Sequence, residues 1–514
     1  MKDGRIKWDT RVAAFVRTNS DEPHLRDRSC GQRMSLLISG VWLITLLGAV
    51  VRLAYLNHPM RYDEAYNYLH FASRSPSYVA THYAPNNHIL HTLLVRFATE
   101  VVGTAPAALR LPAFAAGVLI IPATAWLAWL LSRRASVALT AALAVCCSSP
   151  LIEYSVNARG YSLLALLTVL SAVCVYKAIE SPGKRFWWVW GGLLGTAGVY
   201  TVPVMVMPLF GLGVAVLVHA VRQPVGALRR RQMLSGLALV AIVCVSFAGL
   251  LYLPVLVAGG TRSLTDSGRM AYDILGQQIG SSGGMLAEAW RLWMRHVPVL
   301  AEVILAFGAV AYLVRAVRTP SAGRWLPPAI VFLSVALAAA FGAPVPARAW
   351  LFALPIFFVC AAQGMCELFP REPETMSQRA FAGCVIAVLT VIPLFSLAGV
   401  AQSPYLCAEP RGLVEVEEAL DECQVFGPER CALVAPYSPA TAYYVAQKHM
   451  AALPLPSSSE ADRVYIVADE NRKLGELWHS GVDGFSAFDP PRVWRTLRQS
   501  TVYFADRTAR SALR

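Results

Sequence analysis

The chain has 514 residues, of which 56% are hydrophobic and 15% charged, whereas about a quarter of the residues in a soluble domain are charged. This balance excludes an ordinary soluble domain. The formal net charge of +13 would suit a nucleic-acid partner, but the basic residues stand in short runs between apolar segments, which is a topology signal. We therefore expect a membrane partner and no nucleic acid.

A polar tail, residues 1–33, precedes the first apolar segment, Met34–Leu56. It has no small-residue cleavage site, so the pattern predicts a signal anchor behind a cytoplasmic tail. A bilayer core of about 30 Å needs about 20 helical residues, and the composition predicts about eleven spans over residues 34–401. The predicted spans are Met34–Leu56, Leu109–Leu131, Ser136–Ser149, Tyr161–Ala178, Phe186–Tyr200, Val202–Val221, Met233–Val257, Val297–Val314, Leu326–Val345, Trp350–Leu368 and Phe381–Ala401.

Basic residues mark alternate connections between these spans, as in Arg133-Arg134 and Arg229-Arg230-Arg231. The positive-inside rule places these connections in the cytoplasm of a cell inner or plasma membrane. The segments predicted on the extracytoplasmic face are 57–108, 150–157, 258–296, 343–349 and 402–514. Within the first of them, Asn87–Gly103 is short and carries charge, so we expect an interfacial helix and not a span.

Residues 402–514 differ from the rest, because strand-like and helix-like runs alternate in a polar background. This alternation predicts a small extracytoplasmic α/β domain. The expected strands are Cys431–Ala435, Arg463–Val467 and Thr501–Phe504, and the expected helices are Leu413–Cys423 and Ala440–His449. Cys423 and Cys431 would be able to pair in an oxidising compartment, although their spacing leaves this open.

Two adjacent carboxylates, Asp63 and Glu64, follow the first span by a few residues. A carboxylate near lipid is costly to desolvate unless it has a partner or a cation, so the pair is a candidate catalytic site. The alternative is a solvated pair of loop charges. Arg61 stands beside them and is a candidate for binding phosphate.

The same loop is dense in groups that both donate and accept hydrogen bonds, which suits a polyhydroxylated ligand. The candidates for binding the acceptor or the sugar are Tyr66, His82, Tyr83, Asn86, Asn87, His88, His91 and Tyr161. His88 and His91 are three residues apart and would share one face of a helix, a spacing that metal sites also use.

The next outside connection carries Glu153 and Arg159. Glu153 is a further catalytic candidate, which would either bind a divalent cation such as Mg²⁺ or Mn²⁺ together with Asp63 or serve in proton abstraction. An internal Glu153–Arg159 ion pair is the structural alternative. Arg159 and Arg348 are candidates for a lipid phosphate, and a headgroup contact is the other interpretation of Arg348.

Three segments resemble glycosyltransferase family 39 of the GT-C superfamily, which includes protein O-mannosyltransferases and lipid A aminoarabinose transferases. They are Arg61–Tyr66, Pro85–Leu94 and Glu153–Tyr161, within a resemblance that covers about residues 34–401. The resemblance implies a GT-C-like polytopic helical fold, a polyprenyl-phosphate sugar donor and inverting transfer to a hydroxyl of a lipid, glycan or protein. It further implies that Asp63 is the base and Glu153 the second acid of the site.

Two other functions would account for a chain with this many spans. A transporter or lipid flippase also needs helices with intramembrane arginines, but we find no internal repeat of the kind common in secondary transporters. The C-terminal segment would otherwise be a binding module with the helices as its anchor, for which about eleven spans far exceed the need. We therefore predict an extracytoplasmic membrane glycosyltransferase.

Overall fold

A computed structural model of the chain describes residues 23–222, 226–279, 282–319, 321–342, 345–368, 397–401, 403, 430–434, 462–469, 491–496 and 500–506. For residues 23–33, 263–283 and 322, and for parts of the strands, it describes only the backbone. Among these residues, eight helices are long and apolar enough to cross a membrane, and a bent pair makes up to nine. The predicted class of polytopic helical membrane protein is confirmed.

The helices of the bundle and the shorter helices between them follow one another with short connections. The helices after the first loop are α6 (Pro106–Ser132), α7 (Ala135–Cys147), α8 (Ser149–Ser155), α9 (Tyr161–Glu180), α10 (Arg185–Thr201), the 3-10 turn η2 (Pro203–Met205), α11 (Val206–Arg222), α12 (Ala227–Ile279), α13 (Ser282–Trp293), α14 (Val299–Arg318), α15 (Ala322–Ala340), the 3-10 helix η3 (Ala347–Ala353) and α16 (Leu354–Glu367). Together with α2 (Pro23–Leu53), each predicted span before residue 369 coincides with one of these helices. The last predicted span, Phe381–Ala401, lies outside the described residues except for its final turn.

The first predicted outside loop is largely helical. It forms α3 (Tyr62–Asn67), the π-helix η1 (Tyr68–Ala72), α4 (Pro76–Thr81) and α5 (Ile89–Val102). The last of these matches the predicted interfacial helix and is too short to be a candidate span. The second long loop also forms helix, because α12 continues beyond a kink at Gly260, whose φ of 64° favours glycine.

Helices α7 and α8 are together long and apolar enough for one span, and they are bent by 60° at the break between them. The break falls at Ser148, whose ψ of 116° is extended. Pro150 follows, and its ring would clash with the carbonyl four residues earlier in a continuous helix. The buried guanidinium of Arg52 donates hydrogen bonds to the carbonyls of Val145 and Cys146 at 3.3 and 3.1 Å. Arg52, at the end of α2, thereby supplies hydrogen-bond donors to carbonyls that lose their intrahelical donors at the break.

Glycines allow two pairs of helices to pack closely. A Cβ on Gly364 of α16 would lie 1.9 Å from the carbonyl oxygen of Gly308 in α14. A Cβ on Gly211 of α11 would lie 2.5 Å from the carbonyl oxygen of Ala329 in α15. Small residues at such positions let membrane helices approach backbone to backbone. The pairs α14–α16 and α11–α15 are therefore fixed by van der Waals contact.

The C-terminal strands form one mixed sheet in the order β1-β2-β4-β3. The strands are β1 (Cys431–Val434), β2 (Arg463–Asp469), β3 (Arg492–Thr496) and β4 (Ser500–Asp506). The β1–β2 pair is parallel and the other two pairs are antiparallel. Three of these strands were predicted and β3 was not. The two predicted helices and the Cys423–Cys431 pairing lie outside the described residues.

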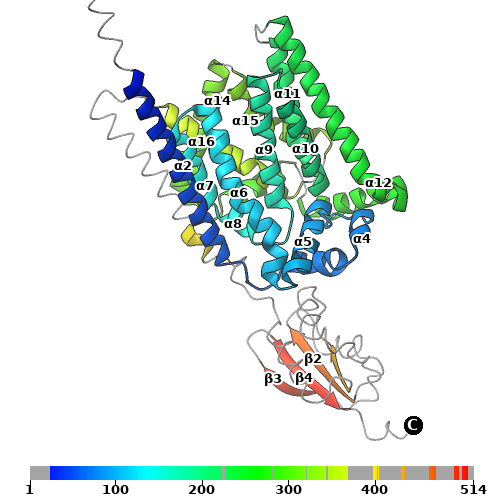
Figure 1. Cartoon of the computed structure of the whole chain (residues 1–514). Coiled ribbons are helices and arrows are strands. Elements are labelled where there is room, and N and C mark those ends of the chain that lie inside the picture. The colour runs from blue at the N-terminus through cyan, green and yellow to red at the C-terminus, as the bar shows by residue number, and fades with distance from the viewer. Residues whose placement is uncertain are drawn as a thin grey trace, which may run out of the picture.

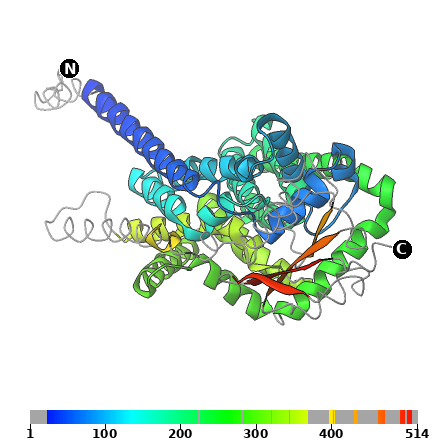
Figure 2. The same cartoon turned by 90° about the horizontal axis from the view of Figure 1, so that it is seen from below.

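The two ends of the helix bundle differ in chemistry. Helices α3, α4, α5 and α8 lie at one end, which we call the site end, and β2, β3 and β4 lie beyond it (Figures 1 and 2). At the opposite end, the basic end, α9, α11, α14 and α16 finish and α15 begins. The basic end carries Arg133, Arg134, Lys177, Lys184, Arg185, Arg222, Arg229, Arg230, Arg231, Arg315, Arg318 and Arg324. These residues include the basic runs that the sequence predicted for the cytoplasmic connections.

Candidate active site

The framework of the site is a buried ion pair between Glu64 and Arg110. Both side chains are fully buried, and Arg110 donates from Nε and Nη2 to the two carboxylate oxygens at 2.8 and 2.7 Å. The same oxygens accept hydrogen bonds from the backbone N–H groups of Ala158 at 2.6 Å and Arg61 at 3.0 Å. The pair thus joins α3, α6 and the connection between α8 and α9.

The remaining donors of Arg110 are also satisfied. They reach the backbone carbonyls of Leu56, His58 and Pro59 at 3.0, 2.5 and 3.0 Å. Burial alone would raise the pKa of Glu64, but the charge of Arg110 and its hydrogen bonds outweigh burial and hold the pKa below its ordinary value. Glu64 is therefore ionised and saturated with donors, which suits a structural role.

Asp63, the other half of the acidic pair, points away from this framework. Its side chain keeps 35% of its accessible area. Nη1 of Arg348 lies 3.7 Å from its Oδ2 atom, and Nη1 of Arg159 donates to its backbone carbonyl at 3.5 Å. The structure therefore brings together the predicted base and the two predicted phosphate ligands, which come from α3, the α8–α9 connection and η3.

Arg159 is almost fully buried, with 1% of its area exposed. Its Nη2 donates to the side-chain oxygen of Asn86 at 3.1 Å. Within the described part of the chain its Nε has no hydrogen-bond partner, and no carboxylate forms an ion pair with it. The guanidinium is therefore held in place without an ion-pair partner among the described residues.

The ring of Tyr161 lies between the two arginines. The guanidinium carbons of Arg159 and Arg348 are 5.8 and 6.0 Å from its centroid, and Nε of Arg348 donates to its hydroxyl at 2.9 Å. His88 and Tyr154 meet the same ring edge-on, with centroids 4.9 and 5.5 Å away. Cation–π contacts and one hydrogen bond thus hold both guanidinium groups in position.

His88 supports the turn that carries Arg159. Its Nδ1 accepts a hydrogen bond from the backbone N–H of Gly160 at 2.9 Å, and a Cβ at Gly160 would lie 2.7 Å from Cγ2 of Thr201. Burial, and then the charges of Arg159, His91 and Arg348, hold the pKa of His88 well below its ordinary value. The imidazole is therefore neutral, as an accepting Nδ1 requires.

His91 lies in the first turn of α5, whose N-cap residue is His88, and it is fully buried. Neither of its ring nitrogens has a hydrogen-bond partner among the described residues. Burial, followed by the charge of Arg159, lowers the pKa of His91 to about 3, although Glu64 acts in the opposite direction. His91 is therefore an uncharged group in the core beneath the site.

Glu153 has different partners from those expected. It is fully buried in α8, and its Oε2 pairs with Nη1 of Arg295 at 2.9 Å. Its Oε1 accepts hydrogen bonds from the hydroxyls of Ser403 at 2.6 Å and Ser149 at 3.4 Å. The alternative of an internal Glu153–Arg159 pair is wrong, because the arginine that neutralises Glu153 precedes α14.

The other predicted ligand-binding side chains have contacts with different groups. His82 stacks on Tyr78, with ring centroids 3.7 Å apart, and Tyr83 meets Tyr252 at 6.1 Å. Asn87 donates to the backbone carbonyl of His82 at 2.7 Å. Tyr66 packs against Tyr62, Phe71 and His70. Of the predicted set, Asn86, His88 and Tyr161 contact Arg159 or its turn.

A metal centre made from Asp63 and Glu153 does not fit this arrangement. Both oxygens of Glu153 are engaged by Arg295 and two hydroxyls, and the charge of Arg295 would repel a cation there. The described residues contain no group of three His, Cys, Asp or Glu side chains placed to hold a metal ion. Glu153 is therefore occupied by protein groups and does not fit the predicted metal site.

Sequence reasoning missed Arg110 and Arg295. Arg110 stands within an otherwise apolar helix, and an arginine in such a place usually has a buried partner. Its position therefore could have indicated a buried ion pair. Arg295 pairs with a residue 142 positions away in the sequence. No local pattern would have indicated that contact.

These features define a multi-span membrane protein with a partly exposed carboxylate and two arginines where its helices end. No family model matches the sequence, and no curated protein matches it. Among solved structures, ArnT from Cupriavidus metallidurans bound to undecaprenyl phosphate is similar, with a TM-score of 0.62 and 15% identity over 90% of this chain and 97% of that chain. Archaeal oligosaccharyltransferase AglB from Archaeoglobus fulgidus, in complex with an inhibitory peptide and a dolichol-phosphate, gives 0.52 and 12% over 84% of this chain and 69% of that chain. The chain shares the fold of these two structures, and the GT-C-like helical fold that the resemblance implied is confirmed.

Proposed function

We propose that the protein is a membrane glycosyltransferase of the family 39 type, which transfers a sugar from a polyprenyl-phosphate donor to an acceptor hydroxyl. The observation that carries the proposal is the partly exposed carboxylate of Asp63 beside two arginines. The fold supports it, since structures with the same fold are bound to undecaprenyl phosphate or dolichol-phosphate. The distribution of basic residues supports an extracytoplasmic active site in the inner or plasma membrane.

The charges of the site suit a phosphate ester. Arg159 and Arg348 bring two positive charges and Asp63 one negative charge, while Glu64 and Arg110 neutralise each other. The surplus positive charge complements the single negative charge of a polyprenyl-phosphate sugar. It complements even better the doubly charged polyprenyl phosphate that leaves, so the arginines stabilise the products and the transition state more than the donor.

Asp63 is the proposed base. Its carboxylate takes the proton of the acceptor hydroxyl while that oxygen bonds to the anomeric carbon on the face opposite the phosphate. The bond from the anomeric carbon to the phosphate oxygen breaks, and its electron pair leaves with polyprenyl phosphate. Each turnover thus gives one glycoside, one polyprenyl phosphate and one proton on Asp63. A single displacement of this kind inverts the anomeric configuration.

Glu153 has a positioning role in this proposal. Its ion pair with Arg295 holds α8 near the start of α14. Its hydrogen bond with Ser403 ties α8 to the chain that follows the predicted spans. Tyr154, the next residue, contacts the ring of Tyr161 between the arginines. The second acid of the family pattern would therefore orient the arginines through its helix without touching the donor.

Proteoliposomes that contain the purified full-length protein test the proposal against transport. They are supplied with polyprenyl-phosphate sugars labelled in the sugar and with an envelope extract as the source of acceptor. We expect the label to leave the lipid and free polyprenyl phosphate to appear in equal amount. Movement of intact donor across the bilayer, without free polyprenyl phosphate, would establish a transporter instead.

A further inference from the structure

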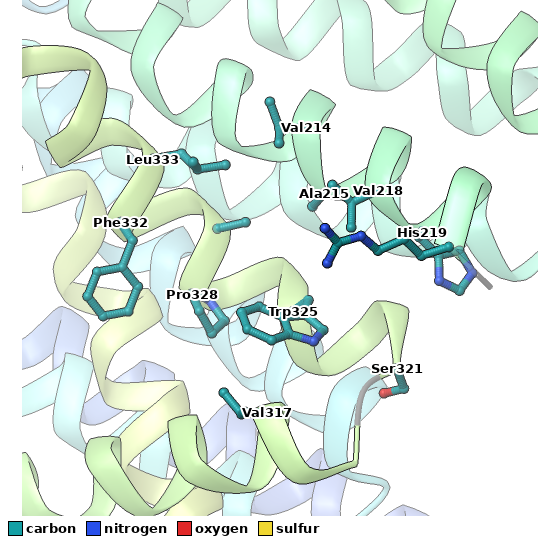
Figure 3. A pocket seen from close by; sticks show the side chains of 12 residues that line it. Val214, Ala215, Val218, His219, Val317, Ser321, Trp325, Pro328, Phe332 and Leu333 are labelled. Carbon is teal, nitrogen blue, oxygen red and sulfur yellow. The ribbon is translucent and has the colours of Figure 1, made fainter. Parts of the chain in front are cut away.

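A cavity of about 580 Å³ lies between α11, α14 and α15. One part of its wall is apolar, with Val214, Phe332 and Leu333, and another part carries His219, Ser321 and Trp325 (Figure 3). Arg222 also lines it. Pockets of this size that combine an apolar wall with a few polar groups are typical of ligand sites.

The cavity is remote from the candidate active site. His219 and Arg222 lie in the last turn of α11, and Ser321 and Trp325 lie at the start of α15, so the cavity is at the basic end. Helix α11 has 17 residues, which places its two ends about 25 Å apart. Its first residues follow Thr201, which adjoins the turn of Arg159. The donor site therefore does not account for the cavity.

The polar side of the cavity carries unneutralised positive charge. Arg222 is exposed and forms no ion pair within the described residues. Glu180 and Glu367 are the acids that pair at this end, and they are already bound to Arg133 and Lys177 and to Arg315 and Arg324. An anion beside Arg222 would therefore meet no competing internal carboxylate among these residues.

The outer wall of the cavity belongs to a surface that faces the bilayer. Val218 is 41% exposed and Phe332 56% exposed. A free phosphate ion would contact only the side near Arg222 and would make no use of the apolar wall, which acyl chains of the bilayer can reach. A molecule with an anionic head and a hydrocarbon chain matches both parts. Trp325, beside the polar groups, is the type of side chain that lies at headgroup level.

We propose that this cavity binds an anionic glycerophospholipid from the leaflet at the basic end, with its phosphate beside Arg222 and an acyl chain between α11 and α15. Basic pockets between transmembrane helices are suited to such headgroups. The bound lipid would extend the α11–α15 contact, which otherwise depends on close packing at Gly211. It therefore stabilises the bundle without taking part in the transfer.

The test uses the purified full-length protein, delipidated in a nonionic detergent, and measures its unfolding midpoint during titration with phosphatidylglycerol or phosphatidylcholine. We expect phosphatidylglycerol to raise the midpoint more. Arg222→Gln should weaken the apparent affinity about fivefold, as the loss of one basic contact implies. Arg318→Gln removes an exposed charge at the same end from a residue that does not line the cavity, and it should behave as wild type.

A second pair of variants tests the apolar wall with every charge retained. Val218→Trp fills the cavity and should abolish the preference for phosphatidylglycerol, whereas Leu217→Trp, on the neighbouring exposed position, should keep it. Equal stabilisation by both lipids, or equal effects of Arg222→Gln and Arg318→Gln, would overturn the proposal. None of these measurements requires turnover, so the outcome is independent of the proposed transferase activity.

Discussion

Two neighbouring regions of the molecule, around Asp63 and around Glu64, use the same chemical group in opposite ways. Glu64 is fully buried and accepts four hydrogen bonds. Asp63 is about one third exposed, and its nearest cation is 3.7 Å away. A carboxylate saturated with buried donors stabilises a fold but is a poor base, whereas a loosely partnered one can accept a proton. Of these two adjacent residues on one short helix, Glu64 thus stabilises the fold and Asp63 is the proposed base.

The largest effect is expected for Asp63→Asn. The amide cannot take the proton of the acceptor, so transfer should fall by about 10³-fold, which is about 4 kcal/mol in the barrier. Because the side chain is partly exposed and has one distant ion-pair partner, the unfolding midpoint should stay within about a degree of wild type, as for most surface substitutions. Initial rates and thermal unfolding of the same preparation check both statements.

Glu64→Gln, in contrast, should lower the free energy of unfolding. It leaves Arg110 charged in the core, and breaking a buried pair usually costs 3–5 kcal/mol. We expect about 3 kcal/mol, near the lower limit of that range, because Arg110 keeps its three backbone carbonyl partners. Denaturant unfolding in detergent measures the loss. A normal stability in Glu64→Gln would contradict the structural role of the pair.

The pH dependence of the free energy of unfolding should show that His91 is uncharged in the folded protein. Its pKa is about 3 in the folded protein and about 6.5 in an unfolded chain. Between these values the unfolded state binds a proton that the folded state does not, so stability falls as the pH is lowered. At pH 5 the loss from this residue is about 2 kcal/mol relative to pH 7. His91→Leu should remove that part of the loss, and unchanged pH dependence in the variant would refute the assignment.

The smallest effect is expected for Arg348→Lys, which keeps the charge. Lysine lacks the planar fork of arginine and would lose the hydrogen bond to Tyr161. We expect kcat/KM for the donor to fall about tenfold, or about 1.4 kcal/mol. Tyr161→Phe, which removes only the hydroxyl, should lower it less. If both variants matched wild type, Arg348 would have no part in holding the phosphate.

The sequence predicted the transmembrane architecture well because lipid imposes a simple rule on composition. Each predicted span before residue 369 coincides with a helix, and the break near Ser149 follows from a proline. The sequence did not separate Asp63 from Glu64, because which of two adjacent side chains is buried depends on Arg110 in another helix. Nor did it indicate Arg295 as the partner of Glu153, since long-range contacts leave no local periodicity.

The placement of the candidate site residues together was predicted in part for a similar reason. The order of Asp63, Arg159 and Arg348 along the chain, each in a connection on the same face, was sufficient to place them at one end of the bundle. The contact of both arginines with Tyr161 depends on the packing of η3 against α9. Such packing is fixed by side-chain shape, which a hydropathy pattern does not record.

The most direct test of the central claim is a density map of the full-length protein with bound undecaprenyl phosphate. We predict the phosphate within hydrogen-bond distance, about 3 Å, of the guanidinium groups of Arg159 or Arg348 and next to the carboxylate of Asp63. A phosphate bound in the cavity beside Arg222, with the Asp63 region empty, would contradict the account.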